Sequence, residues 1–201
     1  IKRLRDPNLR RLNSDDLGKI GIAGEVRNRD MLYHVFTSRK LRRPISAVVK
    51  GESSVGKSHI VKSILRLVPP EDVKVFTRVT PQGLYYMDED ALHHKVLVIY
   101  ERQGSDGGDY SIRSLISENE LRLCVTIRDP ETGKYATNER VVRGPVCYVE
   151  TTTELKVHAE NETRLFSLFV DESEDQTRAI FAVQNRYYKP RPTTSDAEVE
   201  A

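Results

Sequence analysis

Residues 51–58 read GESSVGKS and lie between an apolar run, SAVVK, and a segment whose apolar residues recur at helical spacing. They match the pattern G-x-x-x-x-G-K-[ST] at every fixed position. The glycines let the backbone turn so that its N–H groups converge on phosphate oxygens, and the following helix adds the positive end of its dipole. The stretch therefore predicts a strand, a phosphate-binding loop and a helix in direct succession. A chance serine-glycine turn before a capped helix is the alternative.

The loop residues have distinct expected roles. Lys57 should reach the β and γ phosphates of a nucleoside triphosphate, and the hydroxyl of Ser58 should ligate Mg²⁺. The predicted cofactors are therefore ATP and Mg²⁺. The predicted nucleotide contacts are Gly51, Glu52, Ser53, Ser54, Val55, Gly56, Lys57 and Ser58.

A second motif is expected at VLVIYE, residues 96–101, an apolar strand pattern that ends in an acid. Nucleotide-hydrolysing enzymes usually place an aspartate for the metal and a glutamate for the attacking water at such a strand end. Here Tyr100 takes the place of the aspartate, and Glu101 is the candidate catalytic residue. A neutral tyrosine does not offset a divalent charge as a carboxylate does, so the metal would depend on Ser58, phosphates, waters and Glu101. An ordinary exposed glutamate, or compensation by the acids of MDED at 87–90, are the alternatives.

Composition narrows the class of protein. Of 201 residues, 38% are hydrophobic and 31% charged, which is typical of a globular chain rather than a disordered one. The sequence has no apolar run near the roughly 20 residues that cross a bilayer. The two cysteines, Cys124 and Cys147, show neither metal-site spacing nor the density of a disulfide scaffold. We therefore expect a cytoplasmic protein without membrane association and, because the chain begins at Ile1, a piece of a longer one.

Charge is unevenly distributed. Residues 1–50 hold 13 Lys and Arg against 5 Asp and Glu, a local excess of +8, which leaves −6 for the remainder of a chain with net charge +2. Basic clusters such as SRKLRR would suit a phosphate backbone, or would equally form a solvated helical surface.

Periodicity predicts strands alternating with helices, and hence an α/β fold with a parallel sheet flanked by helices. The expected strands are 44–50, 73–79, 95–101, 145–153 and 164–171, and the expected helices are one capped by Asp30, one from the loop to Pro69, and 81–94, 110–118 and 173–188. An alternating β-hairpin is expected at about 121–143, with Leu121, Leu123, Val125 and Ile127 on one face. The expected domains are a basic N-terminal helical extension at 1–45, a nucleotide-binding core at 46–172, a C-terminal helix at 173–188 and a flexible tail at 189–201.

The order of these motifs resembles an AAA+ ATPase, a P-loop NTPase. The hairpin before VCYVETTT is similar to that of the pre-sensor hairpin clade, which contains the minichromosome maintenance helicases. Two stretches, GIAGEVRNRDMLYHVFTSRKLRRPISAVVKGESSVGKS and PVCYVETTTELKVHAENETRLFSLFVDES, resemble the ATPase part of helicase or primase-helicase proteins of phages and mobile elements. The resemblance extends over residues 20–185.

The resemblance implies roles for further residues. Thr152 and Thr153 correspond to the polar residues that sense the γ-phosphate, with a threonine-rich strand end as the alternative. Arg164 corresponds to an arginine that reaches the neighbouring subunit's nucleotide, with an ion pair to Glu160 or Glu162 as the alternative. The hairpin tip would grip DNA through Lys134, with Arg128 and Arg140 farther down its strands. A homo-oligomeric ring, a hexamer, is implied as well.

Taken together, the sequence predicts the ATP-driven motor domain of a DNA replication helicase or primase-helicase. Two other classes stay open. One is an ATP-gated assembly or regulatory module that hydrolyses poorly, which the tyrosine at position 100 favours. The other is a monomeric P-loop kinase-like enzyme, which the hairpin and Arg164 disfavour.

Overall fold

Five parallel strands form the central sheet, in the order β2-β3-β6-β1-β7. The computed structural model describes residues 5–19, 21–52, 56–80, 82–100, 106–128, 133–153 and 162–187. The strands are β1 (Ala47–Lys50), β2 (Val73–Phe76), β3 (Lys95–Ile99), β6 (Val146–Thr152) and β7 (Phe166–Phe169). Because neighbouring strands are parallel, the segments that follow β1, β3 and β6 all leave from one edge of the sheet, the carboxyl edge.

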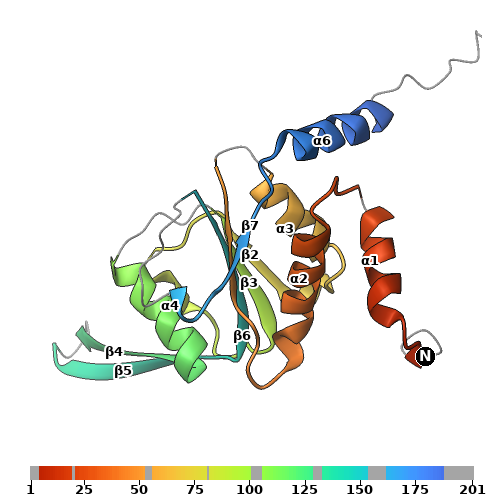
Figure 1. The fold of residues 1–201 in the computed structure, drawn as a ribbon. Coiled ribbons are helices and arrows are strands. Elements are labelled where there is room, and N and C mark those ends of the chain that lie inside the picture. Colours follow the sequence, from red (N-terminus) through yellow and green to blue (C-terminus); the bar gives the residue numbers. More distant parts are fainter. Residues whose placement is uncertain are drawn as a thin grey trace, which may run out of the picture.

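Helices cover both faces of this sheet (Figure 1). The helices are α1 (Leu9–Lys19), α2 (Val26–Thr37), α3 (Lys57–Leu65), α4 (Asp106–Glu118) and α6 (Glu174–Tyr187), with short 3-10 turns η2 (Ser38–Lys40), η3 (Pro70–Asp72) and η4 (Gly83–Tyr86). Helices α1 to α3 lie on one face and α4 on the other, while α6 lies across the carboxyl edge (Figure 1). Strands β1 and β6 are buried along their whole length, as expected for central strands covered on both sides.

Alternate residues of the strands pack into two separate hydrophobic clusters, one on each face of the sheet. Val49, Val98 and Val149 face the cluster that includes residues of α2 and α3. Val48 and Leu97 face the cluster that includes residues of α4. This alternation is the period-two geometry of a strand. It explains why the apolar runs that the sequence analysis identified are continuous.

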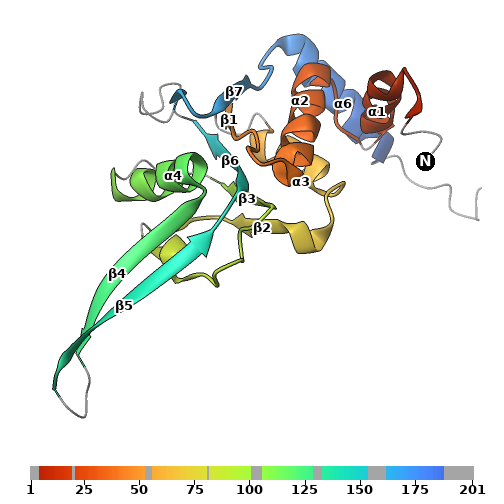
Figure 2. The ribbon, with the colours of Figure 1, turned by 90° about the horizontal axis from the view of Figure 1, so that it is seen from below.

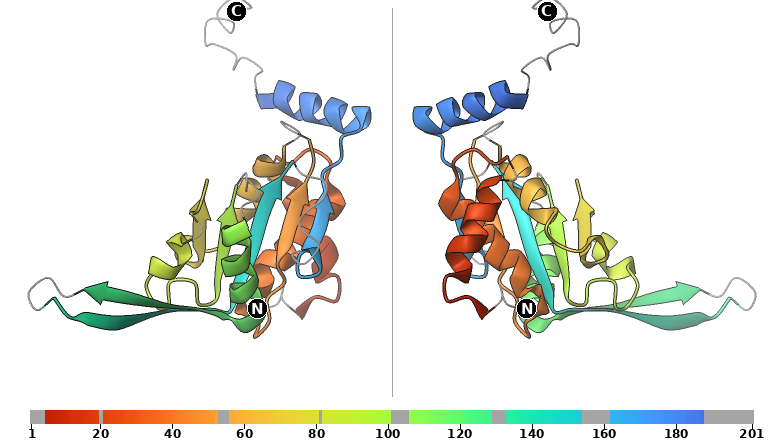
Figure 3. Two further views of the ribbon diagram at one scale, coloured as in Figure 1. Left: turned by 90° about the vertical axis from the view of Figure 1, so that its left-hand side faces the viewer. Right: turned by 90° about the vertical axis from the view of Figure 1, so that its right-hand side faces the viewer.

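The hairpin pairs β4 (Glu120–Arg128) with β5 (Tyr135–Arg143) in an antiparallel ladder. Leu121 and Val142 are buried at its base, where they join the core on the α4 side. Burial decreases outward along the predicted apolar face, and Ile127 is exposed. The hairpin therefore projects as an arm from the domain (Figures 2 and 3).

The helix predicted at 81–94 is wrong. In the described part of this segment, residues 82–94, only the short turn η4 is helical. Its backbone bonds elsewhere: the Arg143 N–H donates to the Glu89 carbonyl at 2.6 Å, and the His94 N–H donates to that of Pro145 at 2.8 Å. The positive φ of 55° at His94 also interrupts helical geometry. Long-range bonds to the hairpin base therefore prevent a helix here.

Two expected element boundaries, one at a helix and one at a strand, also differ in the structure. Asp30 does not cap α2, because the helix begins at Val26 and Glu25 is the N-cap, with φ 49°. Within the segment expected as an N-terminal extension, Leu32, Val35 and Phe36 of α2 are buried in the core beside the sheet. The strand expected at 73–79 ends at Phe76.

Candidate functional site

The phosphate loop lies at the carboxyl edge of the sheet, between the end of β1 at Lys50 and the start of α3 at Lys57. Gly56 is the N-cap of α3 and has φ 93° and ψ 9°, a left-handed conformation that favours glycine. No described atom lies within 4 Å of the point where a Cβ on Gly56 would stand, so the backbone rather than crowding requires glycine. Ser53, Ser54 and Val55 lie outside the described residues.

Lys57 directs its side chain into this loop. Its ammonium donates to the carbonyl oxygen of Gly51 at 2.8 Å and to that of Glu52, and the residue is buried. The positive charge is thereby held within the loop rather than in solvent. A cation inside a loop that opens a helix is an arrangement suited to a phosphate chain.

Ser58, the second residue of α3, is partly buried on the first turn of the helix. A triphosphate and Mg²⁺ fit the residues at this loop, because Lys57 supplies the charge and the Cβ side of Gly56 is open. Lys57 would hold the phosphates, and Ser58 would offer its hydroxyl to the cation.

The end of β6 lies directly beside the loop. Thr152, the last residue of β6, pairs in register with Lys50, the last residue of β1. Strand β6 also extends two residues past its last pair with β3, which is Glu150 with Ile99. Thr152 is buried and Thr153 exposed, so the structure brings the predicted sensor residues to the edge that carries the loop.

Tyr100 follows β3, and its ring joins the core on the α2 and α3 face. The Lys62 ammonium of α3 lies 5.2 Å from the ring centroid. Burial raises the pKa of the phenol to about 12. The position where a metal-binding aspartate was expected therefore holds a neutral packed ring. Glu101 lies outside the described residues.

Glu89, one of the MDED acids, does not compensate for the missing aspartate. The carboxylate of Glu89 pairs with Arg143 at 2.7 Å, at the base of the hairpin. This acid precedes the start of β3, so it lies at the amino edge of the sheet, opposite the loop. The structure therefore separates Glu89 from the predicted nucleotide.

A cavity of about 600 Å³ opens beside the loop, beneath α6. It is bounded by the segment 21–25, by the start of α3 and by α6 with the segment before it. Its lining includes Ile22, Ala23, Gly56, His59, Ile60 and Ile180. An apolar cavity next to a phosphate loop has the chemistry to take the base of a nucleotide.

Hydrogen bonds fasten the C-terminal segment over this cavity. The Gln176 side-chain amide donates to the Ala23 carbonyl at 2.8 Å, and the backbone N–H of Asp171 donates to the Glu25 carboxylate at 2.7 Å. The Glu172 carboxylate accepts from the backbone N–H of Glu52, in the loop itself, at 2.6 Å. The sequence analysis missed these residues. The glycines of GIAG at 21–24 were the available signal, but only the fold brings them to α6.

A family model described as the MTBMA_p00010 P-loop domain matches residues 15–200. The chain belongs to this P-loop domain family. The match extends over almost the whole chain, and the parallel sheet with its loop is that of an α/β P-loop NTPase. Nucleotide binding follows from this membership. No curated protein matches the chain.

Within this P-loop domain, Arg164 precedes β7, whereas the loop follows β1. Arg164 is exposed, and its Nε donates to the Ser117 hydroxyl at 2.8 Å, on the last turn of α4. Arg164 precedes the first residue of β7, so it lies on the amino side of the sheet. Two residues earlier, Glu162 pairs with the buried ammonium of Lys50 at 2.7 Å. The expected alternative was an ion pair of Arg164 with Glu160 or Glu162. Glu162 pairs with Lys50, and Glu160 lies outside the described residues.

The three cations predicted on the hairpin occupy different places. Lys134 and Arg128 flank the tip, where the Arg128 Nε donates to the Gly133 carbonyl at 3.3 Å. Arg140 lies nearer the base, with its guanidinium 4.9 Å from the ring centroid of Tyr86 in η4. Arg128 ends β4 and Lys134 directly precedes β5, so these two residues lie at the end of the arm, whereas Arg140 does not. Figure 3 shows how the arm projects.

Part of the basic N-terminal cluster has a structural role. Asp72 accepts ion pairs from Lys40 at 2.8 Å, Arg39 at 3.0 Å and Lys95 at 3.1 Å. The hydrogen bond from Lys40, with those from Lys95 and Arg39, holds the pKa of Asp72 well below its usual range.

In the part of the chain that the structure describes, no helix has both the length and the apolar composition to span a bilayer.

Proposed function

We propose that this P-loop domain is the ATP-hydrolysing motor of a DNA replication helicase or primase-helicase, of the AAA+ type that the sequence resembles. Its site would bind ATP at 51–58, and hydrolysis would move the hairpin along DNA. The proposal goes beyond the family assignment, which supports nucleotide binding.

The position of β6 is the observation that carries the proposal. Strand β6 lies between β1 and β3, so Thr152 lies between the loop and the end of VLVIYE. The projecting hairpin leads directly into β6 through Gly144 and Pro145. A change at the phosphates would thus have a short mechanical route to the arm.

Each residue near the loop has a proposed task. Lys57 binds the phosphates, and Ser58 holds Mg²⁺, which when bound neutralises phosphate charge. Thr152, or Thr153, orients the attacking water with its hydroxyl. Glu101 accepts a proton from that water as a general base.

Arg164 would act on a neighbouring subunit within a ring. Arg164 is exposed, and its hydrogen bond to Ser117 keeps its side chain at the end of α4 rather than at its own loop. Both observations support this role. Arginines that reach a neighbour's nucleotide contribute on the order of 10³–10⁵ in rate.

A second candidate function rests on Tyr100. Its buried, neutral ring is no substitute for a metal-binding carboxylate, which favours a domain that binds ATP tightly and hydrolyses it slowly. Steady-state turnover separates the two functions. An ATP-gated assembly module would assemble on binding ATP and show no DNA-stimulated hydrolysis.

The test of the nucleotide site replaces its lysine. Lys57→Ala should abolish ATP binding in calorimetry, because it removes the cation held within the loop. Lys62→Ala is the matched control, since it removes an exposed ammonium from the same helix and should bind ATP like the parent. Equal affinity of Lys57→Ala and parent, with both folded by circular dichroism, would overturn the assignment.

A further inference from the structure

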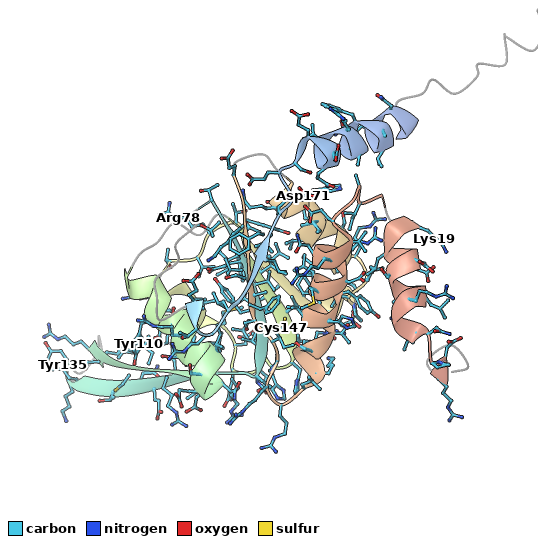
Figure 4. The ribbon with its side chains drawn as sticks, in the orientation of Figure 1. Lys19, Arg78, Tyr110, Tyr135, Cys147 and Asp171 are labelled. Carbon is cyan, nitrogen blue, oxygen red and sulfur yellow. The ribbon has the colours of Figure 1, made fainter. Side chains whose placement is uncertain are left out.

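An exposed aromatic ring lies at the outer end of the hairpin arm (Figure 4). Tyr135, the first residue of β5, is 74% exposed, the highest value among the large apolar side chains that the structure describes. It pairs in register with Arg128, the last residue of β4. Residues directly opposite in an antiparallel ladder project to the same face, so Tyr135 and Arg128 share one face of the arm. The next pair on this face is Thr126 with Thr137.

The other hairpin charges in the described ladder are engaged within the domain. Arg122 pairs with Glu120 at 2.7 Å and with Glu139 at 3.2 Å. The Arg140 guanidinium lies 4.9 Å from the centroid of the Tyr86 ring, near the base of the hairpin. Tyr135, in contrast, presents its ring to solvent at the end of the arm.

The charge of the tip is balanced. Residues 125–138 carry two cations, Arg128 and Lys134, against two acids, Asp129 and Glu131, a formal sum of zero. A surface that bound nucleic acid by phosphate attraction alone would carry an excess of positive charge. The exposed ring therefore makes the faces of bases the better ligand for this tip than the phosphate backbone.

We propose that Tyr135 stacks on unpaired bases and makes the hairpin tip a single-strand nucleic-acid site, with Arg128 beside it. This deepens the proposed function by naming what the hairpin binds. Bases in a duplex are stacked on each other and present only their edges, whereas bases in a single strand present their faces to aromatic rings. Because stacking releases few counterions, binding at the tip should depend only weakly on salt.

The experiment measures binding of labelled oligonucleotides to the full chain by fluorescence anisotropy, with ATP and Mg²⁺ present. The probes are oligothymidine, an abasic strand of equal length and a duplex of equal length. Tyr135→Ala should bind oligothymidine about 5- to 100-fold more weakly than the parent, the loss that one stacked base implies. Tyr135→Phe, which keeps the ring, should retain the affinity. Phe181→Ala should bind like the parent, because it removes a 59% exposed ring from α6.

Comparison with the abasic strand isolates the contribution of the bases to the affinity. The abasic strand keeps the phosphates, so parent and Tyr135→Ala should bind it equally weakly. Equal binding of oligothymidine by parent and Tyr135→Ala, with a loss in Arg128→Ala, would overturn stacking while leaving a phosphate-gripping hairpin. Parent binding to the duplex or the abasic strand as tight as to oligothymidine would also overturn it. Absence of binding to every probe would overturn both this inference and the DNA-binding part of the proposed function, whereas calorimetry with ATP tests the nucleotide site separately.

Discussion

Tyr100 occupies a position where two requirements conflict. Its ring packs in the core beside α3, but its hydroxyl finds no hydrogen-bond partner among the residues that the structure describes. A buried polar group without a hydrogen-bond partner destabilises the folded state, whereas a buried aromatic ring stabilises it. The hydroxyl is therefore the dispensable part of this side chain for stability.

Tyr100→Phe should leave the free energy of unfolding unchanged or raise it by up to about 1 kcal/mol, because it removes an unpartnered hydroxyl and keeps the ring. Denaturant unfolding measures the effect. Tyr148→Phe is the matched control: its buried hydroxyl donates to the Glu150 carboxylate at 2.5 Å. That variant should lose about 1–3 kcal/mol. A similar loss in Tyr100→Phe would show that the hydroxyl has a partner.

Alkaline pH offers a second measurement on the same pair. Burial raises the pKa of Tyr100 from 10.0 to about 12, so the folded state favours the neutral phenol. The stability from this group is fully present below the unfolded pKa near 10 and is lost as the pH rises through about 12. The parent should therefore lose stability relative to Tyr100→Phe between these values. Parallel pH profiles would mean that the phenol titrates normally in the folded protein.

Helix α6 is attached to the rest of the domain through a close approach at Gly24. This glycine has φ 56°, and a Cβ on it would overlap the side-chain oxygen of Gln176. Gln176 is buried and donates to the Ala23 carbonyl at 2.8 Å. The contact closes one side of the cavity beside the phosphate loop.

Gly24→Ala should destabilise the fold by about 2 kcal/mol and weaken ATP binding, because it adds left-handed strain and displaces Gln176 from its hydrogen bond. Gly133→Ala is the matched control: its φ is 68°, and its nearest neighbour would lie at an ordinary 3.7 Å. It should cost about 1 kcal/mol and leave ATP binding unchanged. In the Gly24→Ala background, Gln176→Ala should add almost nothing, since the bond is already lost. Additive losses would contradict this account.

The central sheet separates the phosphate loop from Arg164, the arginine that we propose acts on the nucleotide of a neighbouring subunit. The loop leaves the carboxyl edge after β1, whereas Arg164 precedes β7 and bonds to the end of α4. Strand β7 alone spans about 13 Å at the rise of a β-strand. A subunit related by rotation could present its nucleotide to this arginine.

Arg164→Ala subunits should bind ATP normally. Their rate of ATP hydrolysis should be about 10³-fold lower than that of the parent, or lower still, if Arg164 acts as arginines that reach a neighbour's nucleotide do. Mixing them with Lys57→Ala subunits should restore activity, because a mixed interface pairs an intact loop with an intact arginine. The measurement is steady-state ATP hydrolysis in the presence of DNA. Absence of rescue, where light scattering shows mixed rings, would mean that Arg164 acts in its own subunit or stabilises the fold.

Local patterns determined much of this protein from the sequence alone. The loop, helix α3, the hairpin and the buried strands each depend on the spacing of nearby residues, such as Gly51 and Gly56 or the apolar residues of β6. Spacing of this kind reflects backbone geometry over one or two turns. The parallel α/β fold followed from it.

Long-range contacts decided the rest. The segment 81–94 has a composition suited to a helix, but hydrogen bonds to Arg143 and Pro145 hold it in turns. The cavity joins residues near 22, 60 and 180, and the direction of the Tyr100 ring depends on packing with α3. Neither has a local signature, because both arise when distant segments meet on folding. Sequence determines which elements can form, and their packing determines which side chains share a site.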